Sequence, residues 1–174
     1  MKIIKNLTFA ALAATLVFQT SITRADDEGR DHRDAIITWT KHITAVLPPG
    51  GEIFATIAGT AGGDIGDGIV IGEAFNPREF LPDGSVTFEA DYHFVGPKHS
   101  ITVHFRTVQG RDPSGVITGV IIGVVKDGWL KGNVVTGHYT GRSCDEGVTF
   151  TCFDGIFVIE RGSKNDDDDD NDGE

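Results

Sequence analysis

Basic side chains are scarce in this chain. Its 174 residues include 15 Lys and Arg against 26 Asp and Glu, which gives a formal net charge of −11. Nucleic-acid binding depends on basic side chains that neutralise phosphates, and no basic cluster stands out along the sequence. We therefore expect no nucleic-acid partner.

The sequence also lacks the motifs of several enzyme classes. Neither GxSxG nor HExxH occurs, so there is no signature of an α/β-hydrolase or of a zinc protease. Cys144 and Cys152 are the only cysteines, which is too few for a four-cysteine zinc site and the wrong spacing for a CxxC redox motif. Paired carboxylates of a glycosidase stay open, because separation in space is not visible in a sequence.

Only the N-terminus carries a long apolar run. Lys2 and Lys5 precede the apolar residues 7–18, and small residues follow at Thr23 and Ala25. This pattern predicts a secretory signal peptide over residues 1–25, because the run is too short for a membrane span; a retained anchor is the alternative. Cleavage would lower the net charge to −14 by removing three basic residues. We expect a soluble periplasmic or extracellular protein with no transmembrane segment in the mature chain.

Export also bears on the two cysteines. In an oxidising compartment an even number of cysteines favours a disulfide. We therefore expect a bond between Cys144 and Cys152 that serves as a structural staple.

The C-terminus is strongly acidic. Residues 163–174 contain seven Asp and Glu, and such a block repels itself and cannot bury apolar area. We expect a disordered tail that promotes solubility, with binding of a cation or of a basic partner as the alternative. Between the two ends, we expect an N-terminal segment over residues 26–50 and one β-domain over residues 51–162.

The strongest structural signal is a hairpin over residues 85–109. Apolar and polar residues alternate strictly on both sides of a Gly-Pro turn, which is typical of two half-buried strands. One register places Asp91 opposite His104 and Glu89 opposite Arg106, so opposite charges meet. A shift by two residues keeps the same faces and places His93 opposite His104 and Asp91 opposite Arg106.

Short apolar runs separated by turn residues continue on both sides of this hairpin. Asp-Gly pairs at residues 127–128 and 154–155 predict tight hairpin turns. Besides the two arms of the central hairpin, the predicted strands are residues 52–59, 68–75, 115–126, 129–139, 148–153 and 156–161.

Eight short strands in hairpin order predict an all-β fold, a small antiparallel meander barrel, with a β-sandwich as the alternative. In shape alone, such a barrel resembles calycin-like and allene-oxide-cyclase-like barrels. No family motif accompanies that shape, and the Gly-x-Trp of lipocalins is not present at the first strand.

Residues 34–47 fit two structures. Ile36, Trp39, Ile43, Val46 and Leu47 lie on one helical stripe. The same segment is rich in β-branched residues and alternates as a strand would. We expect a short N-terminal helix here, with a strand as the alternative.

The polar face of the central hairpin holds the first candidate site. Asp91, His93 and His104 share this face, and two histidines with one carboxylate can hold a transition metal. Glu89 and Arg106 lie on the same face and complete a candidate polar ligand site. A face that simply meets water would show the same alternation.

A second candidate site lies around the segment GGDIGDG. Asp64, Asp67 and Glu73 resemble a calcium loop superficially, although the ligand spacing of an EF-hand is missing. A tight glycine-permitted turn is the alternative. Seven aromatic residues are expected to point inward and to pack mainly as core: Phe54, Phe88, Tyr92, Phe94, Phe105, Phe150 and Phe157.

These observations predict an exported barrel that binds a small apolar or amphipathic ligand, or acts as an interaction module, without catalysis. One alternative is a barrel isomerase or cyclase that acts on a hydrophobic small molecule. Another is a structural exported protein with a cation-binding tail. We expect no cofactor other than a divalent cation, and the sequence leaves the oligomeric state open.

Overall fold

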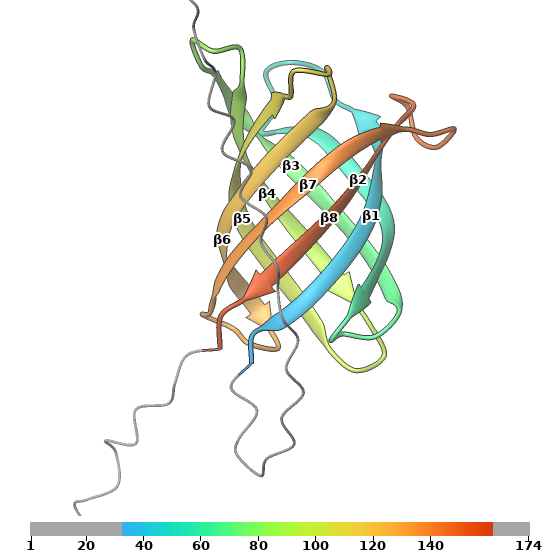
Figure 1. The fold of residues 1–174 in the computed structure, drawn as a ribbon, viewed down its shortest axis with the longest axis vertical. Coiled ribbons are helices and arrows are strands. Elements are labelled where there is room, and N and C mark those ends of the chain that lie inside the picture. The colour runs from blue at the N-terminus through green and yellow to red at the C-terminus, as the bar shows by residue number, and fades with distance from the viewer. Residues whose placement is uncertain (1–32, 162–174) are drawn as a thin grey trace, which may run out of the picture. The chain divides into compact units, whose positions relative to one another are not determined.

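The computed structural model describes residues 33–161, which form a closed barrel of eight antiparallel strands (Figure 1). Each strand pairs with its neighbours in the sequence, and β8 returns to pair with β1. The predicted meander barrel is confirmed. The predicted signal peptide and acidic tail lie outside the described residues. The strands are β1 (Ala35–Val46), β2 (Ile53–Gly63), β3 (Gly68–Phe80), β4 (Val86–Val95), β5 (Ser100–Arg111), β6 (Ile117–Gly128), β7 (Val134–Ser143) and β8 (Thr151–Ile159).

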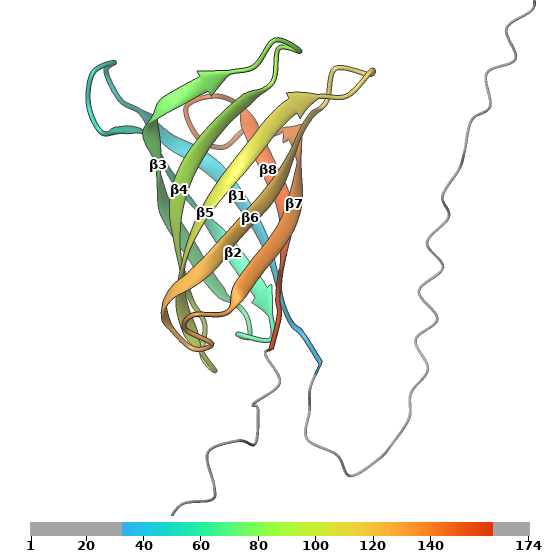
Figure 2. The same cartoon turned by 90° about the vertical axis from the view of Figure 1, so that its left-hand side faces the viewer.

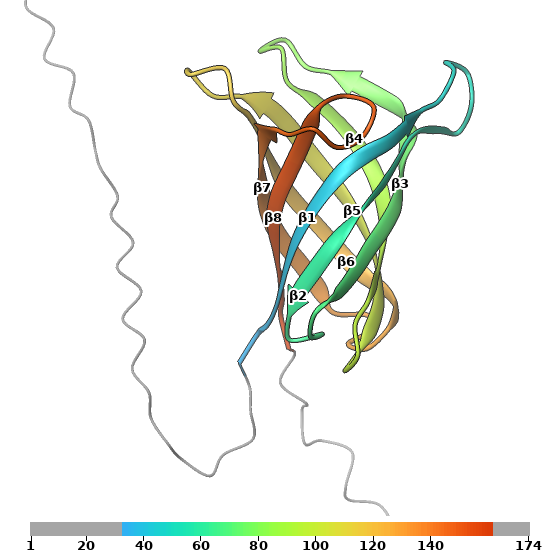
Figure 3. The same cartoon turned by 90° about the vertical axis from the view of Figure 1, so that its right-hand side faces the viewer.

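The barrel has two different ends, which the side views in Figures 2 and 3 make clear. One end, here called the distal rim, carries the loops of residues 47–52, 81–85, 112–116 and 144–150. The opposite end carries the remaining loops together with Ala35 and Ile159, where β1 begins and β8 ends. These two residues are paired neighbours in the sheet.

The N-terminal helix expected over residues 34–47 is wrong, because this segment is strand β1. Ile37 pairs with Gly63 of β2 and with Phe157 of β8, so β1 closes the barrel. A helix would have left both neighbouring strands with unpaired edges, and this pairing decides between the two periodicities. The barrel therefore begins at Ala35 rather than at residue 51.

The tight turn predicted at Asp154-Gly155 is also wrong, because both residues lie within β8. Gly155 pairs with Trp39 on one side and with Tyr139 on the other. A Cβ atom at Gly155 would overlap the Trp39 indole. This glycine provides close approach of a ring to the backbone rather than a turn. The sequence analysis missed β1 and divided β8 into two strands. These two errors cancel, so the expected number of strands was correct.

The Asp127-Gly128 pair does not form a two-residue turn either. Strand β6 stays paired with β5 as far as Gly128, which lies opposite Ile101. Residues 129–133 make the connection, and Leu130 has a positive φ of 61° there. β7 therefore begins at Val134 rather than at residue 129.

The register of the central hairpin is the first of the two predicted. Asp91 lies opposite His104, and Glu89 lies opposite Arg106. On the inner face of the same strands Tyr92 lies opposite Val103. Apolar residues thus meet inside the barrel and opposite charges meet outside.

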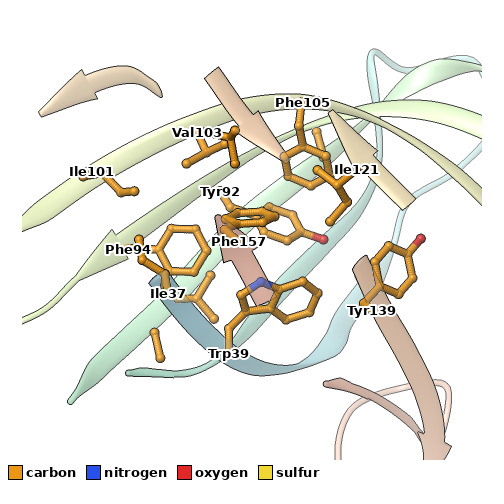
Figure 4. Packing of buried hydrophobic residues seen from close by; sticks show 14 of the residues in the cluster. Ile37, Trp39, Tyr92, Phe94, Ile101, Val103, Phe105, Ile121, Tyr139 and Phe157 are labelled. Carbon is orange, nitrogen blue, oxygen red and sulfur yellow. The ribbon is translucent and has the colours of Figure 1, made fainter. Parts of the chain in front are cut away.

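Aromatic side chains fill the centre of the barrel (Figure 4). The rings of Tyr92 and Phe105 meet edge to face with centroids 4.7 Å apart, and Phe94 packs similarly against Phe157 at 5.4 Å. Phe150, which was predicted to point inward, is 67% exposed. It lies in the loop before β8 rather than in a strand, so alternation does not apply to it.

The predicted disulfide is confirmed. Cys144 and Cys152 are bonded with their Cα atoms 5.7 Å apart. The bond ties the β7–β8 loop to the second residue of β8 at the distal rim. Within residues 33–161, no helix is long and apolar enough to cross a membrane.

Candidate functional site

The predicted polar face lies on the outside of β4 and β5, and Asp91 is its centre. One carboxylate oxygen of Asp91 lies 2.6 Å from Nδ1 of His104, and the other accepts a hydrogen bond from Nζ of Lys126 at 2.9 Å. Partial burial raises the pKa of Asp91, but the hydrogen bonds and charges of Lys126 and His104 outweigh that effect and lower it. The carboxylate is therefore held ionised by two cationic or polar neighbours.

The other residues of this face have their own partners. Nδ1 of His93 lies 3.0 Å from the hydroxyl oxygen of Thr102, and both residues line a shallow pocket with Asp91. Arg106 donates to the hydroxyl of Thr87 at 2.8 Å and to Glu79 at 3.2 Å.

Glu89 approaches His104 at 3.8 Å. The described part of the chain contains no group of three His, Cys, Asp or Glu placed to hold a metal. Metal binding on this face stays a prediction, and the geometry is that of a surface network of pairs.

The second predicted site does not come together as one cluster. Asp64 lies in the β2–β3 turn, where its carboxylate accepts a hydrogen bond from the backbone amide of Ile36 at 2.8 Å. Asp67 belongs to the same turn, whose backbone relies on a positive φ of 78° at Gly66. Glu73 lies farther along β3, opposite Asp91. Gly63 and Gly66 have a positive φ that suits a tight turn, and calcium binding at this segment stays a prediction.

The barrel interior contains a charged residue that the sequence analysis missed. Lys41 of β1 points inward and is 7% exposed. Its ammonium group donates a hydrogen bond to the hydroxyl of Tyr92. Four aromatic rings surround Nζ, with centroids at 4.4 Å for Tyr92, 5.2 Å for Phe153, 5.3 Å for Trp39 and 5.5 Å for Tyr139.

Burial dominates the electrostatics of Lys41. Among residues 33–161 no carboxylate forms an ion pair with it. Loss of hydration therefore lowers the pKa of Lys41 from 10.5 to about 7. Attraction to the ring faces compensates only in part. A correct assignment of residues 34–47 as a strand would have revealed this lysine, since it alternates with Ile37 and Trp39.

A short polar chain leads from this interior toward the distal rim. Thr107 donates to the Tyr139 hydroxyl at 3.3 Å, and that hydroxyl donates to the side-chain oxygen of Gln109 at 2.9 Å. Burial raises the pKa of Tyr139 to about 12, although the hydrogen bond from Thr107 acts in the opposite direction. Tyr139 is therefore a neutral hydrogen-bonding residue at all ordinary pH values.

The distal rim carries a groove with a volume of about 740 Å³. It lies between the loop that joins β1 to β2 and the outer end of β3. There β3 departs from regular pairing, because Phe75 lies opposite Glu89 whereas Glu79 lies opposite Thr87. Residues 76–78 of β3 lie opposite the single residue Phe88 of β4, and this bulge contacts the β1–β2 loop and forms one wall of the groove.

Hydrogen bonds fix this bulge. The backbone amide of Asn76 donates to the Glu52 carbonyl, and its side-chain amide donates to the Gly51 carbonyl, both at 2.7 Å. The bond between Asn76 and Pro77 is cis. These bonds hold the bulge of β3 against the β1–β2 loop and thereby set the width of the groove.

Apolar side chains line the groove together with the polar side chains of Glu52, Asn76 and Arg78. The ring of Phe54 packs edge to face on Phe88 at 5.3 Å, and the guanidinium carbon of Arg78 lies 4.6 Å above the Phe54 centroid. No carboxylate within the described region forms an ion pair with Arg78. Val46 and Phe80 are exposed in the same groove, with Phe80 72% accessible. The sequence offered no sign of this site, because the bulge brings distant segments together.

The geometry can be summarised in chemical terms. The outer face of β4 and β5 consists of satisfied pairs, the interior is filled by side chains around Lys41, and the distal-rim groove combines exposed apolar surface with a cation that lacks an anionic partner in the described region. Comparison with protein-family models, with curated proteins and with solved structures found no match to this chain.

Proposed function

We propose that the protein is an exported binding module that holds a small amphipathic anion in the distal-rim groove. The observation that carries this proposal is the Arg78 guanidinium, whose carbon lies 4.6 Å from the centroid of Phe54 in a groove with a largely apolar lining. The ligand would have an apolar or aromatic body and a carboxylate or sulfonate group.

Size and lining both support a small molecule. Pockets for small ligands have volumes of roughly 300–1,000 Å³ and apolar walls with a few polar groups that fix orientation. The groove has a volume of about 740 Å³, and Leu47, Phe54 and Phe80 supply its apolar lining. Exposed Phe80 is costly in water, and a ligand would cover it.

Arg78 supports an anionic group on that ligand. A guanidinium group can donate two parallel hydrogen bonds to a carboxylate, and stacking on a ring holds its plane in place. Glu52 also lines the groove but forms no ion pair with Arg78. The cation is therefore free to take its anion from a ligand.

The interior supports the isomerase or cyclase alternative less well. That alternative needs a chamber inside the barrel, and the rings of Trp39, Tyr92, Phe105, Tyr139 and Phe157 occupy the interior instead. For an eight-stranded barrel, side chains of this size nearly fill the available width. Export is supported by the N-terminal charge and apolar pattern and by the disulfide, which suits an oxidising compartment.

The test uses 8-anilinonaphthalene-1-sulfonate as a probe, because it has an aromatic body and one anionic group. Two-dimensional NMR titration should place the largest shifts at residues 46–54 and 76–80. The Arg78→Gln variant should bind the probe roughly tenfold more weakly, the loss expected for one charge-assisted hydrogen bond. Arg111→Gln serves as the control, since Arg111 lies at the same rim and bonds the Gly115 carbonyl outside the groove.

The two variants make the result decisive. Shifts in the groove with a loss confined to Arg78→Gln would support the proposal. Shifts elsewhere on the barrel, or equal affinity for the wild type and Arg78→Gln, would overturn it.

A further inference from the structure

The outer face of β6 differs from the rest of the barrel wall. Val120, Ile122 and Val124 follow one another on this face, and Ile122 is 63% exposed. Val108 of β5 lies beside Val120, and Val134 of β7 lies beside Val124. These five exposed residues form one diagonal band across three strands, here called the β6 stripe.

Charge is distributed unevenly around this stripe. The chain is acidic, with a net charge of −11. However, the outward-facing residues beside the stripe are neutral or basic: Thr136 and His138 on β7, and His104 and Arg106 on β5. Along the middle of these three strands, as the structure describes them, no carboxylate points outward. Two acidic molecules can approach each other most easily at such a surface, since like charges elsewhere would repel.

The nearest basic groups already have partners. Arg106 pairs with Glu79, Lys126 with Asp91 and Arg142 with Asp154. The face therefore offers few unpaired cations to a polyanion, and its main feature is apolar. A neutral apolar surface is the partner that fits it.

The stripe is also nearly symmetric about Ile122. Val120 and Val124 lie one step before and after it on β6, and Val108 and Val134 lie at equal distances on opposite neighbouring strands. When two copies pack face to face, their twofold axis lies in the plane of the interface, so this same stripe supplies both sides of the contact. Twofold dimers require a surface that is complementary to itself.

We propose that the β6 stripe is the contact surface of a homodimer, in which two barrels pack with Ile122 on the twofold axis. Val108 of one copy then lies over Val134 of the other. The stripe spans about 13 Å along β6 and three strands spaced about 4.8 Å apart, so its apolar core has a footprint of roughly 190 Å².

Such a core matches the apolar centre of a normal interface. A stable interface buries about 800 Å² on each partner, with an apolar centre and a polar rim. The surrounding threonine and histidine side chains of β5 and β7 provide that rim. This proposal is independent of ligand binding at the distal rim.

The first test is the mass of the protein in solution by light scattering and sedimentation velocity. The wild type should be a dimer, and Ile122→Lys should raise the dissociation constant by roughly 100-fold or more, because the axis would bring two ammonium groups together. Ile71→Lys is the matched control. Ile71 is an exposed isoleucine on the outer face of β3, 48% accessible, and its replacement should leave the dimer intact.

The second test places the axis. Stacked sheets lie about 10 Å apart, so a bismaleimide of about that length should link two copies of Ile122→Cys. It should not link two copies of Ile71→Cys. Circular dichroism of all variants establishes that each is folded before it is scored.

The outcomes are distinct. A monomeric wild type, a dimer that survives Ile122→Lys, or a dimer broken equally by Ile71→Lys would each overturn the proposal. A stripe covered by the acidic C-terminal residues of the same chain would give a monomer that dimerises only after truncation at residue 162, and this result too would contradict it.

Discussion

The inner and outer faces of the barrel wall treat charge in different ways. On the outer face, Asp91 contacts both His104 and Lys126, and water screens all three groups. On the inner face, Lys41 has a tyrosine hydroxyl and four rings around it. Each outer ion pair therefore adds little to the free energy of unfolding. The buried charge of Lys41 lowers the free energy of unfolding, and the packing of the rest of the barrel must offset that loss.

The largest expected effect comes from removal of the inner charge. Lys41→Met keeps the length of the side chain and removes the buried ammonium group. We expect the free energy of unfolding to rise by about 3 kcal/mol at pH 7, in line with apolar replacement of other buried charges. Urea denaturation measures it. Lys126→Met, which removes an exposed lysine, should not stabilise the barrel, and a loss of stability in Lys41→Met would show that the ring contacts outweigh burial.

The same lysine predicts the pH dependence of stability. Its pKa in the folded state is about 7, below the unfolded value of 10.5. Between these values the unfolded chain binds more protons, so stability rises with pH, by at most about 1.4 kcal/mol per pH unit. Below pH 7 both states are protonated and the contribution of Lys41 is constant.

The window for this measurement is pH 7 to 10. Above pH 10 the raised pKa of Tyr139, about 12, acts in the opposite direction, because stability is lost as the exposed tyrosine of the unfolded chain ionises. Lys41→Met should flatten the curve within the window. An unchanged slope in that variant would assign the pH dependence to other groups.

The next largest effect on stability is expected at Gly155, which has no side chain on the inner face. Gly155→Ala places a methyl group against the Trp39 indole. We expect a loss of about 2 kcal/mol in the free energy of unfolding, typical of overpacking in a core. Thermal denaturation followed by tryptophan fluorescence measures it. Gly110→Ala is the control, because a Cβ atom there would meet only the Ser85 side chain at ordinary contact distance.

The smallest effect is expected on the outer face. Asp91→Asn removes the carboxylate from its two partners and should cost less than about 1 kcal/mol at neutral pH. Because the pKa of Asp91 is lowered in the folded state, its contribution is present at neutral pH and is lost as the pH falls through that lowered value. Urea denaturation of both proteins at pH 7 and at pH 3 should show a smaller difference at pH 3 than at pH 7. If Asp91→Asn lowered the free energy of unfolding as much as Gly155→Ala does, the outer ion pairs would not be weak contributors and the contrast between the two faces would be wrong.

The hairpin of β4 and β5 could be predicted down to two registers that differ by two residues, because both of its faces are sorted by polarity; only the structure selects the one with Asp91 opposite His104. The alternation of Tyr92 and Phe94 with Asp91 and His93 admits few pairings. Residues 34–47 could not be assigned in this way, since their apolar residues satisfy both a helical and a strand period. That ambiguity concealed Lys41, whose burial follows only once β1 is known to close the barrel.

The candidate groove could not be predicted for a different reason. Its lining comes from the β1–β2 loop and from a bulge in β3, which are distant in sequence and follow no periodic pattern. The Asp154-Gly155 pair shows a related limit. An Asp-Gly pair in the sequence can indicate a tight turn, or it can lie within a strand where the glycine leaves room for a neighbouring side chain. Here Gly155 leaves room for Trp39 of the neighbouring strand, which only the structure shows.

The pairing of Ala35 with Ile159 has a practical consequence for anyone who wishes to rearrange this molecule. A short linker between these residues would make the meander continuous, so that new ends could be opened in any exposed loop without changing strand order. Both residues also lie at the end of the barrel away from the distal rim. A surface attachment or reporter domain fused there would leave the groove facing outward and accessible.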